Sequence, residues 1–251
     1  MTLPVERLPP GLEIRRAQDR DTTRTDWLDS RHSFSFGQHY DPRNTHHGLL
    51  LANNDDTVAP GTGFETHPHR DMEIVTWVLD GGLVHQDSIG HNGVIYPGLA
   101  QRMSAGSGIL HSEKNDSWRL AGGAQHTDPV HFVQMWVVPD TERIDPGYEQ
   151  LDINAELAKG GLVPVASGKG HDAAISIRQR DAVLWAARLQ PGEAVTVPDG
   201  RWAHIFLARG TAGLEGAGPL TEGDAVRLTA AGSPRLVAGD AGAEVLIWQM
   251  G

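Results

Sequence analysis

The sequence predicts an all-β protein built from antiparallel barrels or sandwiches. Thirty glycines and 15 prolines separate short runs rich in Val, Ile, Leu and Trp. Examples of these runs are EIVTWVLDG (73–81), HFVQMWVVPD (131–140) and AEVLIWQMG (243–251). Strands divided by turn residues at short intervals are typical of antiparallel folds, whereas parallel sheets alternate strands with long helices. Helical pattern is scarce, and we expect only one or two turns within residues 147–158.

The chain also shows two halves of similar layout. LQPGEAVTVPDGRWAHIFLARGTAGLEG (189–216) repeats the order of turn and strand signals found in VAPGTGFETHPHRDMEIVTWVLDGGLVHQD (58–87). Eleven of the 13 histidines lie at or before residue 131, so the later half has few candidate metal ligands. We therefore predict a metal-binding barrel over residues 1–140, followed by a linker and a second barrel without ligands over residues 141–251.

Composition excludes several classes of function. The net charge of −11 argues against a nucleic-acid surface, which needs clustered Lys and Arg. The chain has no cysteine, which rules out disulfides, thiolate ligands and cysteine nucleophiles. No apolar run approaches the ~18 residues of a membrane span, and the first residues lack the apolar segment of a secretion signal. We expect a cytoplasmic monomer that contacts neither membranes nor nucleic acid directly.

A first cluster of candidate ligands lies in THPHRDMEIV, residues 66–75. If this segment is one continuous strand, alternate side chains share a face, which groups His67 and His69 with Asp71 and Glu73. Two imidazoles and an acid on one face fit a metal site, although a His-x-His pair alone also fits hydrogen-bonded surface histidines. The pair needs a partner elsewhere in the chain.

That partner is found in MSAGSGILHSEKN, residues 103–115, where a glycine-rich turn precedes His111 and Glu113. The two pairs lie about 40 residues apart with turn signals between them, so two strands of one small barrel can bring them together. Three imidazoles and a carboxylate form a ligand set for a first-row transition metal. Strand parity points both Glu113 and Glu73 inward, so it does not decide which glutamate belongs to the set.

Several longer segments resemble a known family. They are WLDSRHSFSFGQHYDP (27–42), GFETHPHRDMEIVTWVLDG (63–81), HQDSIG (85–90), MSAGSGILHSE (103–113) and QMWVVP (134–139). These segments are similar to the pirin family of the cupin superfamily, and within it to the bacterial pirin-like quercetin 2,3-dioxygenases. The resemblance is close over about residues 12–150, and the glycine that closes the first cupin motif comes one residue late. It implies a bicupin, with two packed antiparallel jelly-roll barrels and few short helices.

The resemblance also implies the ligands and the metal. The implied ligands are His67, His69, His111 and Glu113. Glu113 would also act as the catalytic base, and Glu73 would be a buried acid that needs polar partners. One divalent transition metal per chain is expected, with Fe²⁺ as our choice on resemblance alone and Ni, Co, Mn, Cu or Zn as alternatives.

The implied activity is oxygenation of a flavonol such as quercetin by O₂, with ring opening and release of CO. An alternative is a non-catalytic module whose metal redox state controls binding to a transcriptional regulator or a metabolic enzyme. A third interpretation is a cupin isomerase or decarboxylase that acts on another enolisable compound. No nucleotide or flavin motif appears, so a bound metal would carry the difficult chemical step.

Other noticeable residues have structural interpretations. We expect His85 and Asp87 at a turn and a strand end. Packing in the core or between the halves is expected for Trp27, Phe34, Phe36 and Tyr40, with a position on the wall of the cavity as the alternative for one of them. A solvated face is expected for Asp19, Arg20 and Asp21.

Overall fold

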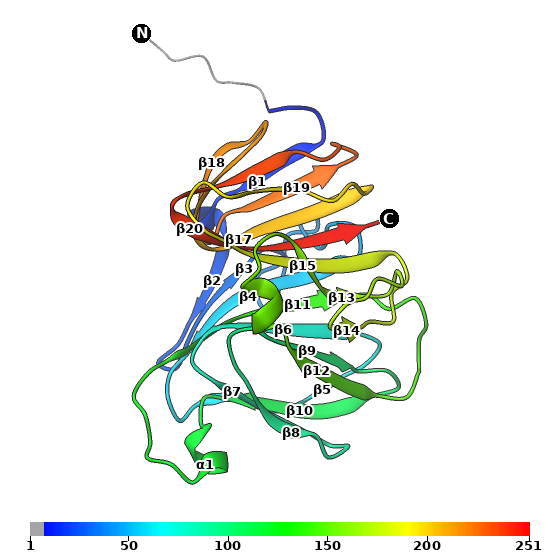
Figure 1. Ribbon diagram of the computed structural model, residues 1–251. Coiled ribbons are helices and arrows are strands. Elements are labelled where there is room, and N and C mark those ends of the chain that lie inside the picture. Colours follow the sequence, from blue (N-terminus) through cyan, green and yellow to red (C-terminus); the bar gives the residue numbers. More distant parts are fainter. Residues whose placement is uncertain (1–7) are drawn as a thin grey trace.

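The computed structural model describes residues 8–251, which form three β-sheets with two one-turn α-helices (Figure 1). The seven-stranded sheet has the order β12 (Gly147–Asp152), β9 (Leu99–Ser104), β6 (Glu73–Asp80), β11 (Val130–Val137), β4 (Leu50–Val58), β3 (Leu28–His32), β2 (Asp21–Arg24). The four-stranded sheet has the order β5 (Gly63–His69), β10 (Ile109–Lys114), β7 (Leu83–Asp87), β8 (Asn92–Ile95). The helices are α1 (Trp118–Ala121) and α2 (Asn154–Leu157), and a 3-10 turn covers Ala17–Asp19.

The third sheet contains nine strands, mostly from the second half of the chain. Its order is β1 (Leu12–Arg15), β19 (Ala225–Thr229), β17 (Trp202–Leu214), β20 (Arg235–Met250), β15 (Ala182–Leu189), β13 (Val163–Ser167), β14 (Ile175–Ser176). In addition, β16 (Ala194–Thr196) pairs with β20, and β18 (Gly218–Thr221) pairs with β17. The strand pairs are antiparallel except for β13 with β14, so the all-β, cupin-type prediction is confirmed.

The sheets pack as sandwiches and do not close into complete barrels. In the first half, hydrogen bonds cross between the four-stranded and seven-stranded sheets, because Glu113 of β10 accepts from side chains of β6 and β11. In the second half, register shifts in the pairing of β17 with β20 allow the nine-stranded sheet to fold over an apolar cluster that includes Ile205, Leu236 and Ile247. The interior of the second half is therefore filled with hydrocarbon.

The largest apolar cluster joins the two halves. It combines side chains of the seven-stranded sheet, such as Trp77, with side chains of the nine-stranded sheet, such as Trp248. The Trp77 indole donates a hydrogen bond to Glu244 at 2.8 Å, and the Trp248 indole donates to the sulfur of Met135 at 3.2 Å. Because both large indoles are buried and hydrogen-bonded, the interface between the two halves is packed like a hydrophobic core.

Two strands cross the predicted boundary at residue 140. β1 pairs with β19 of the nine-stranded sheet, and β12 pairs with β9 of the seven-stranded sheet. Each sandwich thus contains a strand from the other part of the chain. The division at residue 140 stays a prediction. The strand pairing shows that β1 and β12 each join the sheet formed mainly by the other part of the chain.

The expectation of one continuous strand through residues 66–75 was wrong. β5 ends at His69, and β6 begins at Glu73 in a different sheet. Between them Asp71 has a φ of 46°, a left-handed conformation that turns the chain. Strand parity therefore holds for the two histidines and is lost before Asp71 and Glu73.

Two expectations about single residues were also wrong. Tyr40 is 76% exposed and packs in no core. Arg20 is buried and forms an ion pair with Asp55 at 2.7 Å instead of lying on a solvated face. Phe34 is buried in the cluster between the halves, as expected.

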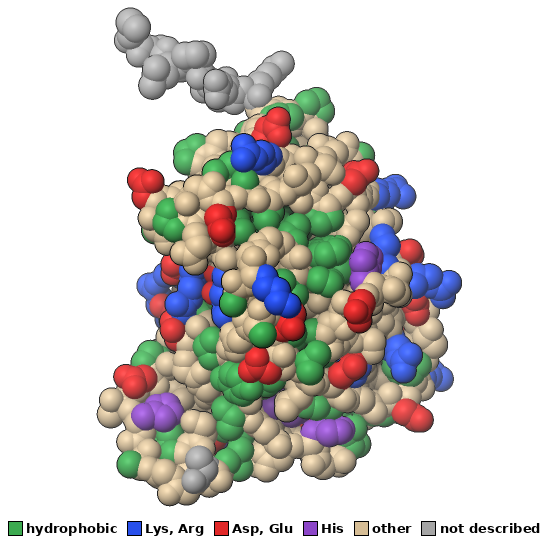
Figure 2. All heavy atoms as spheres, in the orientation of Figure 1, with side chains coloured by type: hydrophobic (Ala, Val, Ile, Leu, Met, Phe, Trp, Pro, Cys, Tyr) green, Lys and Arg blue, Asp and Glu red, His purple; other side chains and the backbone are tan. Residues whose placement is uncertain are grey.

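The surface has mixed charge. On the face drawn in Figure 2, Lys and Arg side chains are interspersed with Asp and Glu. Within residues 8–251, no helix has both the length and the apolar character needed to cross a membrane.

Candidate metal centre

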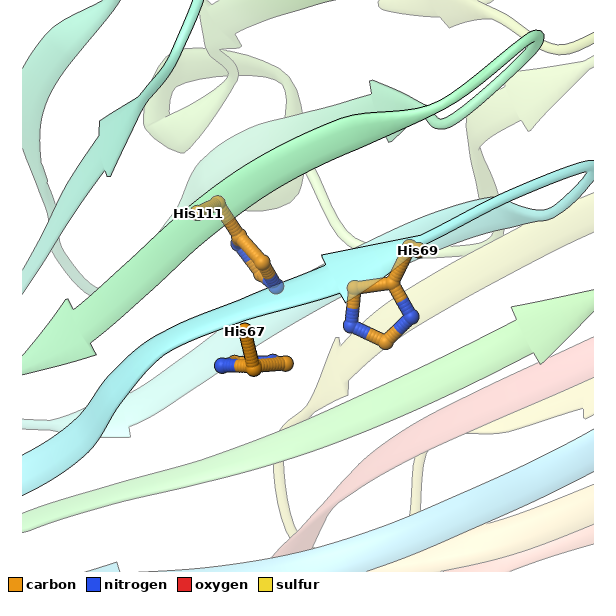
Figure 3. Close-up of side chains that lie close together, drawn as sticks. All are labelled: His67, His69 and His111. Atoms are coloured by element: carbon orange, nitrogen blue, oxygen red, sulfur yellow. The ribbon is translucent and has the colours of Figure 1, made fainter.

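Three histidines from two neighbouring strands come together inside the first sandwich. His67 and His69 lie on the same face of β5, and His111 lies on β10 directly opposite His67 in the strand register. Ring centroids of His67 and His111 are 4.5 Å apart, and the ring of His69 lies 4.9 Å from each. One nitrogen of each ring lies within 4.8 Å of the other two (Figure 3).

Hydrogen bonds fix the tautomers of His67 and His111. The Nδ1 of His67 lies 2.7 Å from the carbonyl oxygen of Glu65, so Nδ1–H donates and Nε2 keeps its lone pair. The Nε2 of His85 lies 3.2 Å from a carboxylate oxygen of Asp87 and donates to it. His85 Nδ1 is then an acceptor, and His111 Nδ1–H donates to it at 3.5 Å. His111 likewise keeps its Nε2 lone pair free.

Two ring nitrogens of this histidine group are buried. The Nε2 atoms of His69 and His111 are buried and have no hydrogen-bond partner within the part of the chain that the structure describes. Burial, followed by the neighbouring imidazoles, lowers the pKa of His69 to about 4 and that of His111 to about 3. Both rings are neutral at pH 7, the state in which histidine binds metals. Buried unpaired nitrogens cost stability, and a metal ion would satisfy them.

Glu113 is the acid of this region. It lies two residues after His111 on β10 and is 2% exposed. The amide of Gln134 donates to one carboxylate oxygen at 2.6 Å, and the hydroxyl of Thr76 donates to the other at 3.4 Å. The indole of Trp136 donates to Gln134 Oε1 at 3.1 Å, and because an indole N–H cannot accept, this bond orients the Gln134 amide toward Glu113.

Of the four side chains predicted as ligands, the structure groups His67 and His69 with His111, and Glu113 with His111 in a second, overlapping group. Beside the histidine group, the ligand atoms of His85, His111 and Glu113 also lie within 4.8 Å of one another. Glu73 lies apart on β6 in the facing sheet, where it accepts hydrogen bonds from Ser104 at 2.9 Å and from the backbone N–H of Arg178 at 3.1 Å. Burial raises the pKa of Glu73, and these donors oppose the shift.

His85 and Asp87 have closer connections to the site than the sequence indicated. Asp87 ends β7, as expected, whereas His85 lies in the middle of that strand, is 1% exposed and contacts His111. Asp87 also accepts a hydrogen bond from the ring of His91 at 2.9 Å. The sequence signal for this role is weak, because only the pairing of β7 with β10 brings His85 beside the metal ligands.

A cavity of about 1130 Å³ opens next to the histidines. His67, His69 and Glu113 lie on one wall, and residues of β2, β3 and β4 form the opposite wall. Protein cavities that hold small molecules are commonly about 300–1,000 Å³, so this one can take a ligand of three aromatic rings.

Two aromatic pairs line the same cavity. Phe36 and Trp136 meet edge to face with centroids 5.2 Å apart, and Trp27 and Phe64 do so at 5.3 Å. The ring centroids of Trp136 and His69 also lie 5.0 Å apart. Trp27 and Phe36 were expected mainly in packing roles, with a cavity position as the alternative for one of the aromatic residues, and both lie on the cavity wall. Partly exposed aromatic rings next to a metal site favour a flat, apolar ligand.

The donor set fits a divalent transition metal. Three imidazoles with nitrogens available for coordination and one carboxylate match the N and O ligands that such ions prefer. Hydrogen bonds to Glu65, His85 and Gln134 orient His67, His111 and Glu113, respectively. Such supporting bonds are usual for the ligands of metals in proteins.

Comparisons with known proteins agree with this arrangement. The family model described as Pirin matches residues 14–137, and the one described as Quercetinase C-terminal cupin domain matches residues 164–250. A Mycobacterium tuberculosis protein provisionally named a quercetin 2,3-dioxygenase is 59% identical over 240 residues, which covers 95% of each chain. The quercetin 2,3-dioxygenase of Escherichia coli K12 is 36% identical, with coverage of 81% of this chain and 84% of its own.

A solved structure extends the likeness to the fold. The crystal structure of YhhW from Escherichia coli is 33% identical, covers 96% of this chain and 97% of its own, and superimposes with a TM-score of 0.84. Another structure, described as the bacterial pirin YhhW in complex with nickel(II), is 32% identical with a TM-score of 0.83, over 95% of this chain and 98% of its own. The matching family models, the high identity over nearly the whole chain and the common fold show that the chain belongs to the pirin family.

Proposed function

We propose that this protein is a metal-dependent dioxygenase that opens the heterocyclic ring of a flavonol such as quercetin. The observation that carries the proposal is the group of three imidazoles, of which His67 and His69 line, together with Glu113, a cavity that also has aromatic rings on its walls. The names of the relatives from Mycobacterium tuberculosis and Escherichia coli support the same reaction. Both atoms of O₂ would enter the organic product, and carbon C3 of the flavonol would leave as CO.

The ligands proposed for the ion are His67, His69, His111 and Glu113, with one ion per chain. A bound divalent ion would supply polarisation of the flavonol 3-hydroxyl and an electronic path to O₂. We propose Fe²⁺ as the native ion, and the nickel complex of YhhW makes Ni²⁺ the first alternative to test. A cytoplasmic location and a monomeric state stay predictions.

Glu113 would move the proton. One of its carboxylate oxygens would accept the proton of the 3-hydroxyl, which leaves an electron-rich enolate ready for oxygenation. Gln134 and Thr76 hold the carboxylate in place while the proton is transferred. Trp136 and Phe36 would contact the flat face of the substrate and keep water from the reacting carbon atoms.

The experiment is an aerobic assay of protein purified anaerobically and reconstituted with each metal in turn. Metal content, O₂ consumption and CO release should be measured together with quercetin as the substrate. We expect one ion per chain and equal amounts of O₂ consumed and CO formed. A protein that holds its ion but consumes no O₂ with any metal contradicts the proposal and favours the metal-dependent binding module.

The variant His111→Ala provides the matched test of the ligand set. We expect it to lose tight metal binding and turnover while it keeps a β-rich circular dichroism spectrum, since the apolar clusters do not depend on this ring. The control is His46→Ala, because the side chain of the exposed His46 hydrogen-bonds only to its neighbour Thr45 among residues 8–251. Stoichiometric metal in His111→Ala would show that the ligand assignment is wrong.

A further inference from the structure

The cavity wall that faces the histidines is polar. Ser30 on β3 lies opposite Asp56 on β4, and His32 lies opposite Asn54 in the same pair of strands. All four side chains are buried and line the cavity. The interior of the second sandwich is apolar by contrast. Buried polar groups are costly unless they are paired, so each needs a partner in the protein or in a ligand.

Most polar side chains of this wall form hydrogen bonds with one another. The Nδ1 of His32 bonds to the side-chain oxygen of Asn54 at 3.0 Å, and its Nε2 bonds to the hydroxyl of Thr23 at 2.9 Å. The same hydroxyl bonds to the ring of His39 at 3.2 Å. Both ring nitrogens of His32 are thus engaged within the wall, and they need no ligand.

Asp56 is the exception. Its side chain is only 3% exposed, and its Oδ1 has no hydrogen-bond partner within residues 8–251. The nearby cations bond to the preceding residue, since Arg20 lies 2.7 Å and His131 lies 2.6 Å from the carboxylate of Asp55. Consecutive side chains of a strand point to opposite faces, so these cations are on the other side of β4. Asp56 is left with Ser30 beside it and one oxygen unused.

Burial raises the pKa of Asp56 to about 7; the hydrogen bond from Ser30 opposes this rise, and the carboxylates of Asp55 and Glu113 add to it. A carboxyl group that is easily neutral pairs well with a hydroxyl group, which both donates and accepts. The aromatic pairs on the adjoining walls indicate that this hydroxyl belongs to an aromatic ring.

We propose that Asp56, supported by Ser30, is a specificity-determining residue that binds a second hydroxyl group of a polyhydroxylated aromatic substrate. The reacting hydroxyl of that substrate lies at the histidines, so the proposal rests on the proposed function and specifies its substrate class. The protein then prefers flavonols that carry ring hydroxyls over those that carry only the reacting one. A site built to hydrogen-bond a hydroxyl discriminates strongly against ligands that lack it, because its polar group is then buried without a partner.

The test compares two substrates in the unmodified protein and in two variants of Asp56, at matched metal occupancy. Quercetin carries ring hydroxyls, and 3-hydroxyflavone carries only the reacting one. In the unmodified protein, kcat/KM should favour quercetin by on the order of 10-fold or more. In Asp56→Leu this preference should disappear, because kcat/KM for quercetin falls to about that for 3-hydroxyflavone, whereas Asp56→Asn should keep part of the preference because the amide oxygen still accepts. A loss of folding alone would lower kcat/KM for both substrates together and leave the ratio of the two values unchanged.

Asp55→Asn is the matched control. It removes the adjacent carboxylate from the opposite face of β4, so it should leave the substrate ratio unchanged even if it lowers stability. An unmodified protein without preference, or a preference that persists in Asp56→Leu, overturns the proposal.

Anaerobic binding separates failure of this proposal from failure of the proposed function. If the metal-loaded protein turns over neither flavonol, the proposed dioxygenase activity fails, and Kd values for both compounds are measured by quenching of tryptophan fluorescence. Tighter binding of quercetin that is lost in Asp56→Leu still supports the subsite. Equal Kd values for the two compounds, or no binding of either, overturn it.

Discussion

At the residue scale, the orientation of His111 depends on side chains that bind no metal themselves. Asp87 accepts from His85, and His85 accepts from His111, so a chain of three side chains decides which nitrogen of His111 is free. Burial raises the pKa of Asp87, but the backbone N–H of His91 and the rings of His85 and His91 outweigh it and hold the pKa below its ordinary value. The carboxylate therefore stays charged at neutral pH and keeps the chain of bonds in one direction.

The variant His85→Leu should weaken metal binding without removing a ligand. It leaves His111 Nδ1–H without an acceptor, so the ring can rotate or change tautomer. We expect metal affinity to fall by about 10–100-fold, the usual effect of losing such a supporting bond. Competition with a chelator of known affinity measures it. His91→Asn is the control, because His91 bonds to Asp87 from a half-exposed position and leaves the acceptor of His111, the His85 ring, in place. Equal affinity losses in both variants would contradict this explanation.

The two buried glutamates, Glu73 and Glu113, should respond differently to loss of charge. Glu113→Gln keeps an oxygen near the histidines but removes the proton acceptor, so oxygenation should drop by on the order of 10² or more, with a modest loss of metal affinity. Glu73→Gln should keep its metal and lose less activity, since Glu73 contacts Ser104 and Arg178 instead of the histidines. Steady-state rates at equal metal occupancy provide the comparison. A metal-free, inactive Glu73→Gln beside a normal Glu113→Gln would reverse the assignment.

At the scale of elements, the pairing of β5 with β10 creates the metal centre. Strand alternation correctly groups His67 with His69, and His111 with Glu113, because alternation is a property of each strand alone. It fails at Asp71, where a left-handed turn ends β5 and sends the chain into another sheet. The sequence contains no glycine at that turn, so the usual signal for a left-handed residue was missing.

Packing across sheets was the part that the sequence did not predict. The cavity roles of Trp27 and Phe36, the contact of His85 with His111, and the unpaired oxygen of Asp56 all depend on which strands become neighbours. Side-chain type shows that these residues are polar or aromatic, but only the strand order shows what they face.

Gly63 is a test of the β5–β10 pair. It has a φ of 153°, and a Cβ at this position would lie 2.3 Å from the carbonyl oxygen of Glu113. Gly63→Ala should push β5 away from β10, destabilise the fold by roughly 1–3 kcal/mol and weaken metal binding. Thermal unfolding and metal titration measure both effects. Gly213→Ala is the control, because nothing lies within 4 Å of its Cβ position, and similar losses in the two variants would argue against the strand-separation explanation.

At the scale of the whole molecule, Asp224 ties the beginning of the described chain to the second sandwich. Its side chain is 1% exposed and accepts hydrogen bonds from Arg16 at 2.7 Å and from the backbone N–H of Ala17 at 2.8 Å. Burial raises the pKa of Asp224, but the backbone N–H groups of Thr221 and Ala17 and the Arg16 guanidinium outweigh it and lower the pKa below its ordinary value.

This shift predicts a dependence of stability on pH. A carboxyl with a lowered pKa in the folded state stabilises the protein above its unfolded pKa of about 3.9, and this contribution is lost as the pH falls through the folded value. Asp224→Asn should therefore lower Tm at pH 6–7, with a difference that shrinks as the pH drops below about 4. Thermal unfolding from pH 3 to pH 7 measures it. A Tm difference that is constant over this range would show that charge at Asp224 is not responsible.

The exchange of β1 into the nine-stranded sheet has a consequence for biosynthesis. β1 is made early, but its partner β19 lies beyond Asp224, which is 207 residues after Ala17. At about 5–20 residues per second, the nascent β1 waits roughly 10–40 s on the ribosome before its partner emerges. The first sandwich can fold during that interval, whereas the second stays open along the edge of β19 until β1 arrives. Translation of the second half alone would produce a sheet with a bare edge, which is a template for association between chains.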